Sequence, residues 1–505
     1  MTIPTRPPAP VRSSEPASTR PSLLFVALLA AGLVVRILAT RSTWGQPDGD
    51  DAMVMLMSLR ASQGHFALLF WGGNYGGAIM TWIEGPLILV FGMKIWLFKI
   101  VDLAMNVIAV FLLRSIGRRF LSRIAADVAA GTFFFFPALW LFWSSREYIF
   151  WLPAIVFALA TCLFVLRWFE SESRVDLLAT GLCAGLSIWS YPLVFPLVGP
   201  ALVVLLWSLR KDRKALYGVG LLGLIGVAPW LAYFVLHGRA ALHFQSVKGS
   251  RATDLKHTVT QVLPTAFVGG ERRVGVLWSL VDAAPHRLAL LGAGIYLATA
   301  VYTVVAVYRR EIALAACGAS VLIWPFVLIV GHVPIGPDTY RYGLIPVAPL
   351  LLLAANLLSK VHLAPVLAVA ALVLVATTIS ADTGRFATAP SCNPQLTATT
   401  RFLVAQHRTA VWASYWLSAP LELCAREQVT AGSIAPIRDH LAEVRAASAP
   451  RSTFVVFPGN TLDEQLRAWT RAHHARFVRR TTGGFATWEF DTKVTPAEIG
   501  LSAAL

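Results

Sequence analysis

The sequence predicts a polytopic α-helical membrane protein with about eleven transmembrane helices and a small C-terminal α/β domain. The chain of 505 residues is 56% hydrophobic and has a mean hydropathy of +0.63, whereas soluble domains are roughly 45–50% apolar. Apolar runs recur along most of it, and most of them approach the ~20 residues that cross a bilayer core. From residue 385 onward, short strand-like and helix-like segments replace these runs.

The first elements follow from residue types. Residues 1–20 are rich in Pro, Ser and Arg and predict a disordered cytoplasmic tail. The run 21–40 follows basic residues as a signal peptide does, but Arg36 and the lack of a small-residue cleavage pattern indicate a retained anchor. Unbroken apolar runs exclude a membrane barrel, so the spans are helices. The remaining predicted spans are 95–113, 124–142, 149–166, 176–190, 192–208, 215–236, 287–307, 312–331, 342–358 and 362–380.

Basic clusters predict the orientation, because each falls on every second connection between spans. The clusters are Arg6, Arg12 and Arg20; Arg114, Arg118, Arg119 and Arg123; Arg167 and Arg174; Arg210, Lys211, Arg213 and Lys214; Arg309 and Arg310; and Lys360. One threading places them all in the cytoplasm with the N-terminus. The transmembrane domain, 21–384, then has an outer loop at 41–93, and the domain 385–505 is extracytoplasmic. The net charge of +16 does not indicate nucleic-acid binding, since no basic face with interleaved aromatics occurs.

The C-terminal part alternates strand-like and helix-like segments, which favours a small α/β domain. Its first connection lacks a glycine-rich phosphate loop, so a nucleotide site is not supported. Cys392 and Cys424 lie in this part and could form a disulfide if it is exported.

Three carboxylates, Asp48, Asp50 and Asp51, stand in the outer loop just before an apolar-rich run that predicts a short helix along the interface. Asp is a preferred N-cap, so Asp50 or Asp51 could simply cap this helix. The alternative is that the carboxylates act on a substrate. Asp48-Gly49-Asp50 also fits the DxD pattern of nucleotide-sugar glycosyltransferases, but that pattern recurs by chance and its donors are cytoplasmic.

Further candidates follow in the same loop. Trp71, Asn74 and Tyr75 stand among four glycines at 71–77, and glycine permits close approach of a ligand to the backbone. Aromatic faces and amides suit sugars. Glu84 enters the next apolar run, where a carboxylate is costly unless it is paired or functional; snorkelling to the interface is the alternative.

Basic side chains at the outer ends of later predicted spans could bind a phosphate. Arg341, followed by Tyr342, begins a span on the outer face, where a guanidinium can fork onto a phosphate at headgroup depth. The alternative is an interfacial anchor, with Tyr340 and Tyr342 as aromatic belt residues. Arg146 and Glu147 favour a structural ion pair.

Together these features predict glycosyl transfer outside the membrane. A base deprotonates an acceptor hydroxyl, which attacks the anomeric carbon of a sugar while a lipid phosphate leaves, stabilised by cations. Because no nucleotide is available outside, the activated sugar must arrive on a lipid.

The arrangement resembles the GT-C glycosyltransferases, in particular the bacterial branch around the aminoarabinose transferase of lipid A and the protein O-mannosyltransferases. The resemblance covers most of the chain and rests on Asp50-Asp51, 71–77, 185–189, 229–231, 341–346 and 412–416. It implies an inverting transferase in a bacterial cytoplasmic membrane, with a polyprenyl-phosphate-linked sugar as donor and an envelope glycan, lipid or protein as acceptor.

The resemblance also implies site roles. By position Asp50 matches the general base, and Asp51 stands where the family usually has Glu. A divalent metal is reported for some GT-C enzymes and dispensable in others, so it stays open here, with Asp48, Asp50 and Asp51 as its ligands if one binds. Two other functions stay open: a lipid or solute transporter, against which the lack of evident inverted repeats counts, and a non-catalytic GT-C-like scaffold, which the Asp-for-Glu change leaves open.

Overall fold

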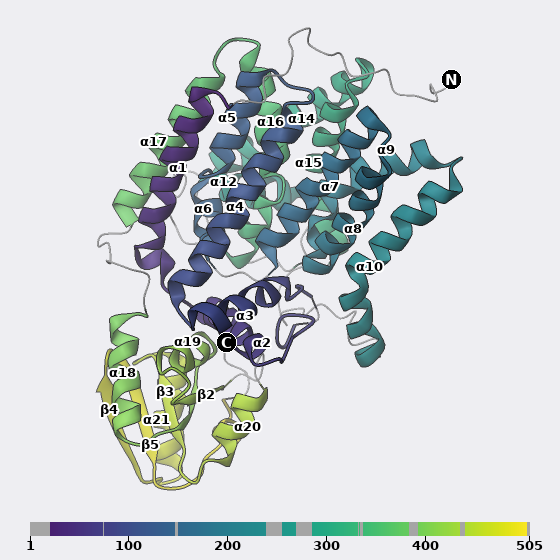
Figure 1. Ribbon diagram of the computed structural model, residues 1–505. Helices are drawn as coiled ribbons and strands as arrows, with labels where there is room; N and C mark the ends of the chain where they lie inside the picture. The colour runs from purple at the N-terminus through teal and green to yellow at the C-terminus, as the bar shows by residue number, and fades with distance from the viewer. Residues whose placement is uncertain are drawn as a thin grey trace.

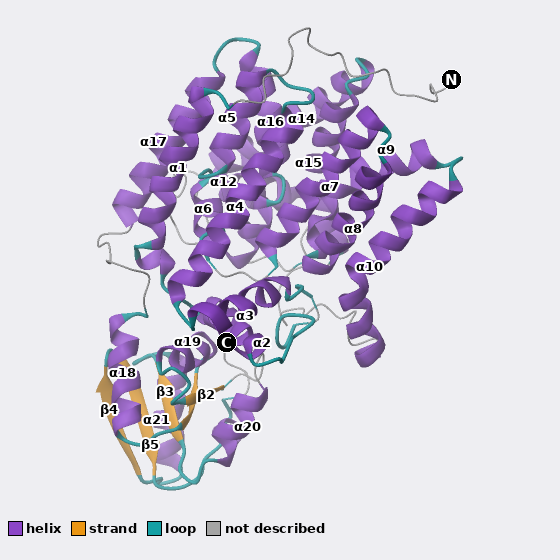
Figure 2. Ribbon diagram, viewed as in Figure 1, coloured by secondary structure: helices purple, strands orange, loops and turns teal. Residues whose placement is uncertain are grey.

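The computed structural model describes residues 21–73, 75–146, 150–238, 255–268, 285–331, 333, 337–382, 392–434 and 440–501. Figure 1 shows a large bundle of helices with a small sheet-containing domain at one end. Two short helices, α2 (Gly49–Ser62) and α3 (Ile79–Phe91), lie between the two parts. Within the residues that the structure describes, the strands lie in the C-terminal domain (Figure 2).

The bundle is built of helices in its described segments, as predicted. Its helices are α1 (Leu23–Thr40), α4 (Ile95–Gly117), α5 (Arg123–Phe133), α6 (Ala138–Trp143), α7 (Trp151–Ser171), α8 (Arg174–Ser190), α9 (Phe195–Leu209), α10 (Arg213–His237), α14 (Pro285–Tyr308), α15 (Ile312–Val330), α16 (Val347–Ser359) and α17 (Ala364–Asp382). Shorter segments are η1 (Thr43–Gly45), η2 (Pro192–Val194), α11 (Leu255–His257), the π-helical η4 (Thr258–Val262), α12 (Leu263–Val268) and η6 (Pro337–Leu344).

The helices confirm the polytopic membrane class. Among the described residues, seven helices are long and apolar enough to cross a bilayer, judged by length and composition. Shorter apolar helices, Ile79–Phe91, Val347–Ser359 and Ala364–Thr377, accompany them. The total of about eleven spans stays a prediction.

One predicted span, 124–142, is two helices in the structure instead of one. The run 124–142 predicts a single helix, but α5 ends at Phe133 and α6 begins only at Ala138. Pro137 lies in the gap; proline lacks an amide hydrogen and disfavours helical backbone in the residue before it, so a helix ends ahead of it. After α6, the turn Ser144-Ser145-Arg146 is buried, and this turn becomes central to the site.

The C-terminal domain is the predicted α/β fold. Its strands are β1 (Ala410–Ala413), β2 (Thr430–Ser433), β3 (Thr453–Val456), β4 (Phe477–Thr482) and β5 (Phe485–Phe490), in the order β2-β1-β3-β5-β4. β1 runs parallel to β2 and β3, whereas β5 is antiparallel to β3 and β4. Its helices are α18 (Pro394–Ala405), α19 (Tyr415–Cys424), α20 (His440–Ser448), α21 (Thr461–Ala472) and α22 (Pro496–Ile499).

Helices cover both faces of this sheet. Successive residues of β3 belong to different apolar clusters: Phe454 packs with Leu466 of α21, and Val455 with Leu421 of α19. This follows from the strand period of two, which turns neighbouring side chains to opposite faces.

A buried carboxylate ties α21 to the sheet. Asp463 is 0% exposed, and Arg479 donates to it from Nε at 3.1 Å and Nη2 at 2.9 Å. Trp488 Nε1 donates at 2.8 Å and the Gly459 amide at 2.9 Å. Burial alone would raise the pKa of Asp463, but the hydrogen bonds from Arg479, Gly459 and Trp488 outweigh it and lower the pKa to about 2.

The structure joins Cys392 to Cys424, so the predicted disulfide is confirmed; it closes a sequence separation of 32 residues. The bridge links the start of α18 to the end of α19. α19 in turn packs on α2, and Gly49 allows the close approach, since a Cβ there would lie 2.9 Å from the Trp416 ring and 3.2 Å from its Cα. The C-terminal domain therefore contacts the helix that carries the aspartates.

Candidate active site

The three aspartates lie at the N-terminus of α2 in three different environments. Asp48 is the N-cap, and its Oδ1 accepts a hydrogen bond from the Asp51 amide at 3.3 Å. Asp51, in the first turn, is 0% exposed, whereas Asp50 is partly exposed. The alternative in which Asp50 or Asp51 caps the helix is therefore wrong: Asp48 has the extended backbone and the side-chain contact that capping requires.

α2 is the short helix that the sequence predicts at this point, and its place along the membrane interface stays a prediction. Its residues 51–58 are all buried. The reason is tertiary: α3 packs on α2 from within the same loop, and α19 packs on it from the C-terminal domain. The first turn of α2 is thus held in place by two neighbouring elements.

Arg146 binds two of the three carboxylates. Its Nη1 contacts Asp48 Oδ2 and lies 3.5 Å from Asp51 Oδ2. Its guanidinium also lies over the ring of Phe142, 4.2 Å from the centroid, and only 5% of its side chain is exposed. Glu147, the partner predicted for Arg146, lies outside the described residues. Arg146 therefore neutralises the aspartate cluster from the turn after α6.

Asp50 makes a different contact. The hydroxyl of Tyr415, at the start of α19, donates a hydrogen bond to Asp50 Oδ1 across a sequence separation of 365 residues. The Tyr415 ring is buried and packs edge-on against Trp416, with centroids 5.0 Å apart. The Asp50 carboxylate thus lies at the junction of the bundle and the C-terminal domain.

The glycine-rich loop is a tight turn packed against later helices. The Phe70 amide donates to Gly76 O and the Gly77 amide to Ser190 O, each at 2.9 Å. Gly76 has a φ of +86°, and a Cβ on it would lie 2.4 Å from the Phe150 ring. Trp189 Nε1 donates to Leu68 O at 3.0 Å. Glycine is required here because the loop backbone lies directly on these neighbours.

The aromatic candidates of this loop, Trp71 and Tyr75, lie in different surroundings. Tyr75 packs against Phe150 and Tyr191, with centroids 5.9 Å and 6.2 Å away. Trp71 is half-buried against the main apolar core. Asn74 lies outside the described residues.

A series of ring contacts connects Tyr75 to Arg341. Tyr191 packs on Trp151 at 5.1 Å, and Trp151 stacks on Tyr342 at 5.7 Å. Arg341 lies over Tyr342 and over Trp143, 5.4 Å and 5.0 Å from the ring centroids. Trp143 ends α6, three positions before Arg146. The same short segment therefore places one cation at the aspartates and holds another among aromatic rings.

Glu84 lies between α3 and α2. It is 0% exposed and accepts a hydrogen bond from Ser58 Oγ at 2.6 Å. Snorkelling to the interface is therefore wrong, because the carboxylate is enclosed where the two helices meet. Ser58 lies two turns beyond Asp51, about 10 Å along the helix axis. Glu84 thus braces the helix that carries the aspartates.

The three aspartates do not converge as one set of metal ligands, because Asp48 and Asp51 contact Arg146 and Asp50 contacts Tyr415. No group of three or more His, Cys, Asp or Glu able to hold a metal occurs in the part of the chain that the structure describes. Arg146 already supplies positive charge to Asp48 and Asp51. The divalent metal stays a prediction, and no step below uses one.

Several residues of this site were not candidates in the sequence. Four aromatic residues come from separate segments, and the fold brings them to Asp50, Tyr75, Tyr342 and Arg341; they are Tyr415, Tyr191, Trp151 and Trp143. One signal was present: Tyr415-Trp416 places two adjacent aromatics directly after the first strand of the C-terminal domain.

Comparison with known proteins gives the same fold. A sequence model of the dolichyl-phosphate-mannose-protein mannosyltransferase family matches residues 77–233, from the end of the glycine loop into α10. The structure is similar to that of ArnT from Cupriavidus metallidurans bound to undecaprenyl phosphate, with a TM-score of 0.62 and 14% identity over 95% of this chain and 99% of that one. Apo ArnT from the same organism aligns over the same shares at 14% identity with a TM-score of 0.50. No curated protein sequence matches significantly. The chain therefore has the fold of ArnT.

Proposed function

We propose that this protein is an inverting glycosyltransferase that moves a sugar from a polyprenyl-phosphate donor to a cell-envelope glycan, lipid or protein. The observation that carries the proposal is the Asp50 carboxylate, which is partly exposed and accepts a hydrogen bond from a neutral hydroxyl at the junction of two domains. The mannosyltransferase match over 77–233 supports the reaction class. The undecaprenyl phosphate bound to the similar ArnT supports a polyprenyl donor.

The neighbours of Asp50 position it. Asp48 caps α2 and Arg146 contacts both Asp48 and Asp51, so the first turn is held from two directions. Tyr415 then orients the Asp50 carboxylate from the C-terminal domain. A general base needs such fixed geometry relative to the proton that it removes.

The reaction is a single displacement. Asp50 takes the proton of an acceptor hydroxyl while the hydroxyl oxygen forms a bond to the anomeric carbon. The bond from that carbon to the lipid phosphate oxygen breaks, and the phosphate leaves with the electron pair. Attack opposite the leaving group inverts the anomeric configuration. We assign Arg341 to the leaving phosphate, since a guanidinium held between Trp143 and Tyr342 is preorganised for an oxyanion.

The sugar itself is assigned to the aromatic side of the site. The ring faces of Tyr75 and Tyr342 suit the C–H faces of a pyranose or furanose. Trp71 and Asn74 stay candidates for contacts with the hydroxyl rim of the sugar. By the positive-inside argument the reaction occurs on the outer face of a bacterial cytoplasmic membrane, with the C-terminal domain outside.

The test compares cells that express wild type, Asp50→Asn or Asp212→Asn at equal levels. Asp212 caps α10, where its side chain accepts from the Ala215 amide at 3.1 Å, so this variant controls for loss of a carboxylate at a helix N-terminus. Mass spectrometry follows the polyprenyl-phosphate sugars and the surface glycans.

General-base catalysis contributes about 10²–10⁴-fold. Asp50→Asn should therefore lose one glycan substituent and accumulate one lipid-linked sugar, whereas Asp212→Asn should match wild type. Identical glycans in wild type and Asp50→Asn would overturn the proposal and favour the transporter or scaffold.

A further inference from the structure

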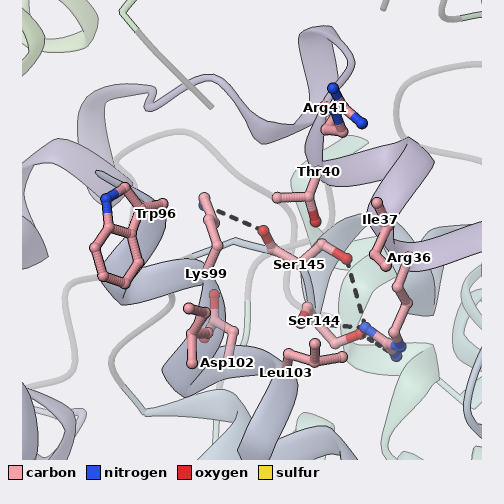
Figure 3. Close-up of a pocket in the computed structure, with 11 residues that line it drawn as sticks. Arg36, Ile37, Thr40, Arg41, Trp96, Lys99, Asp102, Leu103, Ser144 and Ser145 are labelled. Carbon is pink, nitrogen blue, oxygen red and sulfur yellow. Dashed lines mark hydrogen bonds between the residues drawn. The ribbon is translucent and has the colours of Figure 1, made fainter. Parts of the chain in front are cut away.

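A pocket lies where α1 ends and α4 begins, and its volume is about 190 Å³. Figure 3 shows its lining, which includes Arg36, Arg41, Trp96, Lys99, Ser144 and Ser145. It shares a wall with the candidate active site: Ser144 and Ser145 line the pocket, and the next residue, Arg146, contacts Asp48 and Asp51. No sequence motif above points to it.

Two buried cations form the floor of this pocket. Arg36 is 3% exposed and Lys99 is 6% exposed. Arg36 donates from Nε to Phe134 O at 2.7 Å and from Nη2 to Ser144 Oγ at 2.9 Å. Lys99 Nζ donates to Ser145 O at 3.1 Å. That is the one hydrogen bond of this ammonium within the described ranges, and an ammonium has three N–H groups. Lys99 therefore has donors to offer a ligand oxygen.

The charge of the lining favours an anion. Arg36, Arg41 and Lys99 oppose a single lining carboxylate, Asp102, so the pocket carries a net charge of +2. Buried cations are costly at membrane depth unless a counter-charge reduces the cost. A phosphate would supply that charge and accept hydrogen bonds from the Lys99 ammonium and from the Ser145 hydroxyl, whereas the Ser144 hydroxyl already donates to Trp140 O.

The rim of the pocket is apolar and lies at a membrane interface. Ile37, Trp96 and Ile100 line it and are 43%, 39% and 53% exposed. α1 ends at Thr40 and α4 begins at Ile95, so both spans leave the bilayer here, and Trp is enriched at that depth. A cationic floor with an apolar rim suits a phosphate that carries hydrocarbon chains better than a soluble anion.

We infer that this pocket binds the phosphate headgroup of an anionic glycerophospholipid, at a site separate from the donor sugar. The separation follows from the different partners of neighbouring residues: Ser145 accepts from Lys99, whereas Arg146 contacts the aspartates and Trp143 contacts Arg341. The lipid would brace the turn that carries Arg146. The inference does not depend on the proposed transfer reaction.

The test uses the purified full chain in a neutral detergent. Native mass spectrometry measures binding of phosphatidylglycerol, of zwitterionic phosphatidylcholine and of inorganic phosphate. Arg41→Gln removes an exposed rim cation and leaves the buried floor intact. Lys99→Gln removes a floor cation, with thermal unfolding as a check that it folds. Arg210→Gln is the matched control: Arg210 is exposed beside Trp207 at the end of α9 and does not line the pocket.

Phosphatidylglycerol should bind wild type more tightly than phosphatidylcholine or inorganic phosphate does. Arg41→Gln should weaken it about fivefold, the effect of one interfacial cation; Lys99→Gln should weaken it at least as much, and Arg210→Gln should not. Equal binding to wild type and Arg41→Gln would overturn the inference, as would equal binding of the two lipids. Inorganic phosphate as tight as the lipid would show a free-phosphate site. Competition by undecaprenyl phosphate that depends on Arg41 would assign the pocket to the donor, which also overturns it.

Discussion

Arg146→Gln should destabilise the protein strongly, because Arg146 is the cation between two carboxylates at the base of α2. Asp51 is 0% exposed and lies 3.5 Å from Arg146. At an effective dielectric constant of about 20, a pair at this distance attracts by roughly 5 kcal/mol before desolvation is subtracted. Removing one partner of a buried pair costs about 3–5 kcal/mol, since the other charge stays buried. We expect the free energy of unfolding to fall by about 3 kcal/mol.

Thermal unfolding in detergent of wild type, Arg146→Gln, Asp51→Asn and the double variant measures this. The double variant should regain at least half of the loss, because the uncompensated charge is gone. Arg167→Gln is the matched control: Arg167 pairs with Asp176 at 3.0 Å but is 48% exposed, so its loss should stay below about 1 kcal/mol. A loss in Arg146→Gln no larger than that in Arg167→Gln would contradict a buried ion pair, as would a double variant no more stable than Arg146→Gln.

Two further predictions concern the C-terminal domain. The pKa of Asp463 is about 2 against an ordinary 3.8, so its ionised carboxylate contributes about 2 kcal/mol to the free energy of unfolding; this contribution is complete above about pH 4 and is lost as the pH falls toward 2. The free energies of unfolding of wild type and Asp463→Asn should therefore differ at pH 7 and converge below pH 4. A difference that does not change with pH would contradict this. The disulfide closes a sequence separation of 32 residues, for which loop entropy predicts a stabilisation of about 3–4 kcal/mol. The Cys392→Ser/Cys424→Ser variant should have a free energy of unfolding lower by that amount. Identical gel mobility of the wild type with and without reductant would count against the bridge.

The sequence determined the elements of this protein. Apolar runs near span length had to become helices, because lipid offers no partner for backbone polar groups. The alternation of strand-like and helix-like segments after residue 385 is a local sequence pattern, and strands and helices do alternate there in the structure. Pro137 is also present in the sequence, but because apolar residues flank it on both sides, the run predicts one helix, although the structure has a break between α5 and α6.

The site was decided by tertiary structure. Three neighbouring aspartates are equal candidates for a cap until backbone geometry selects Asp48. Arg146 contacts Asp48 and Asp51, which lie more than 90 residues earlier in the sequence. Tyr415 contacts Asp50 across a sequence separation of 365 residues. No local pattern encodes such pairs, because they depend on how helices pack rather than on which residues form them. Whether a carboxylate caps a helix, pairs with a cation or faces an open junction is therefore settled by the partner that the fold brings to it.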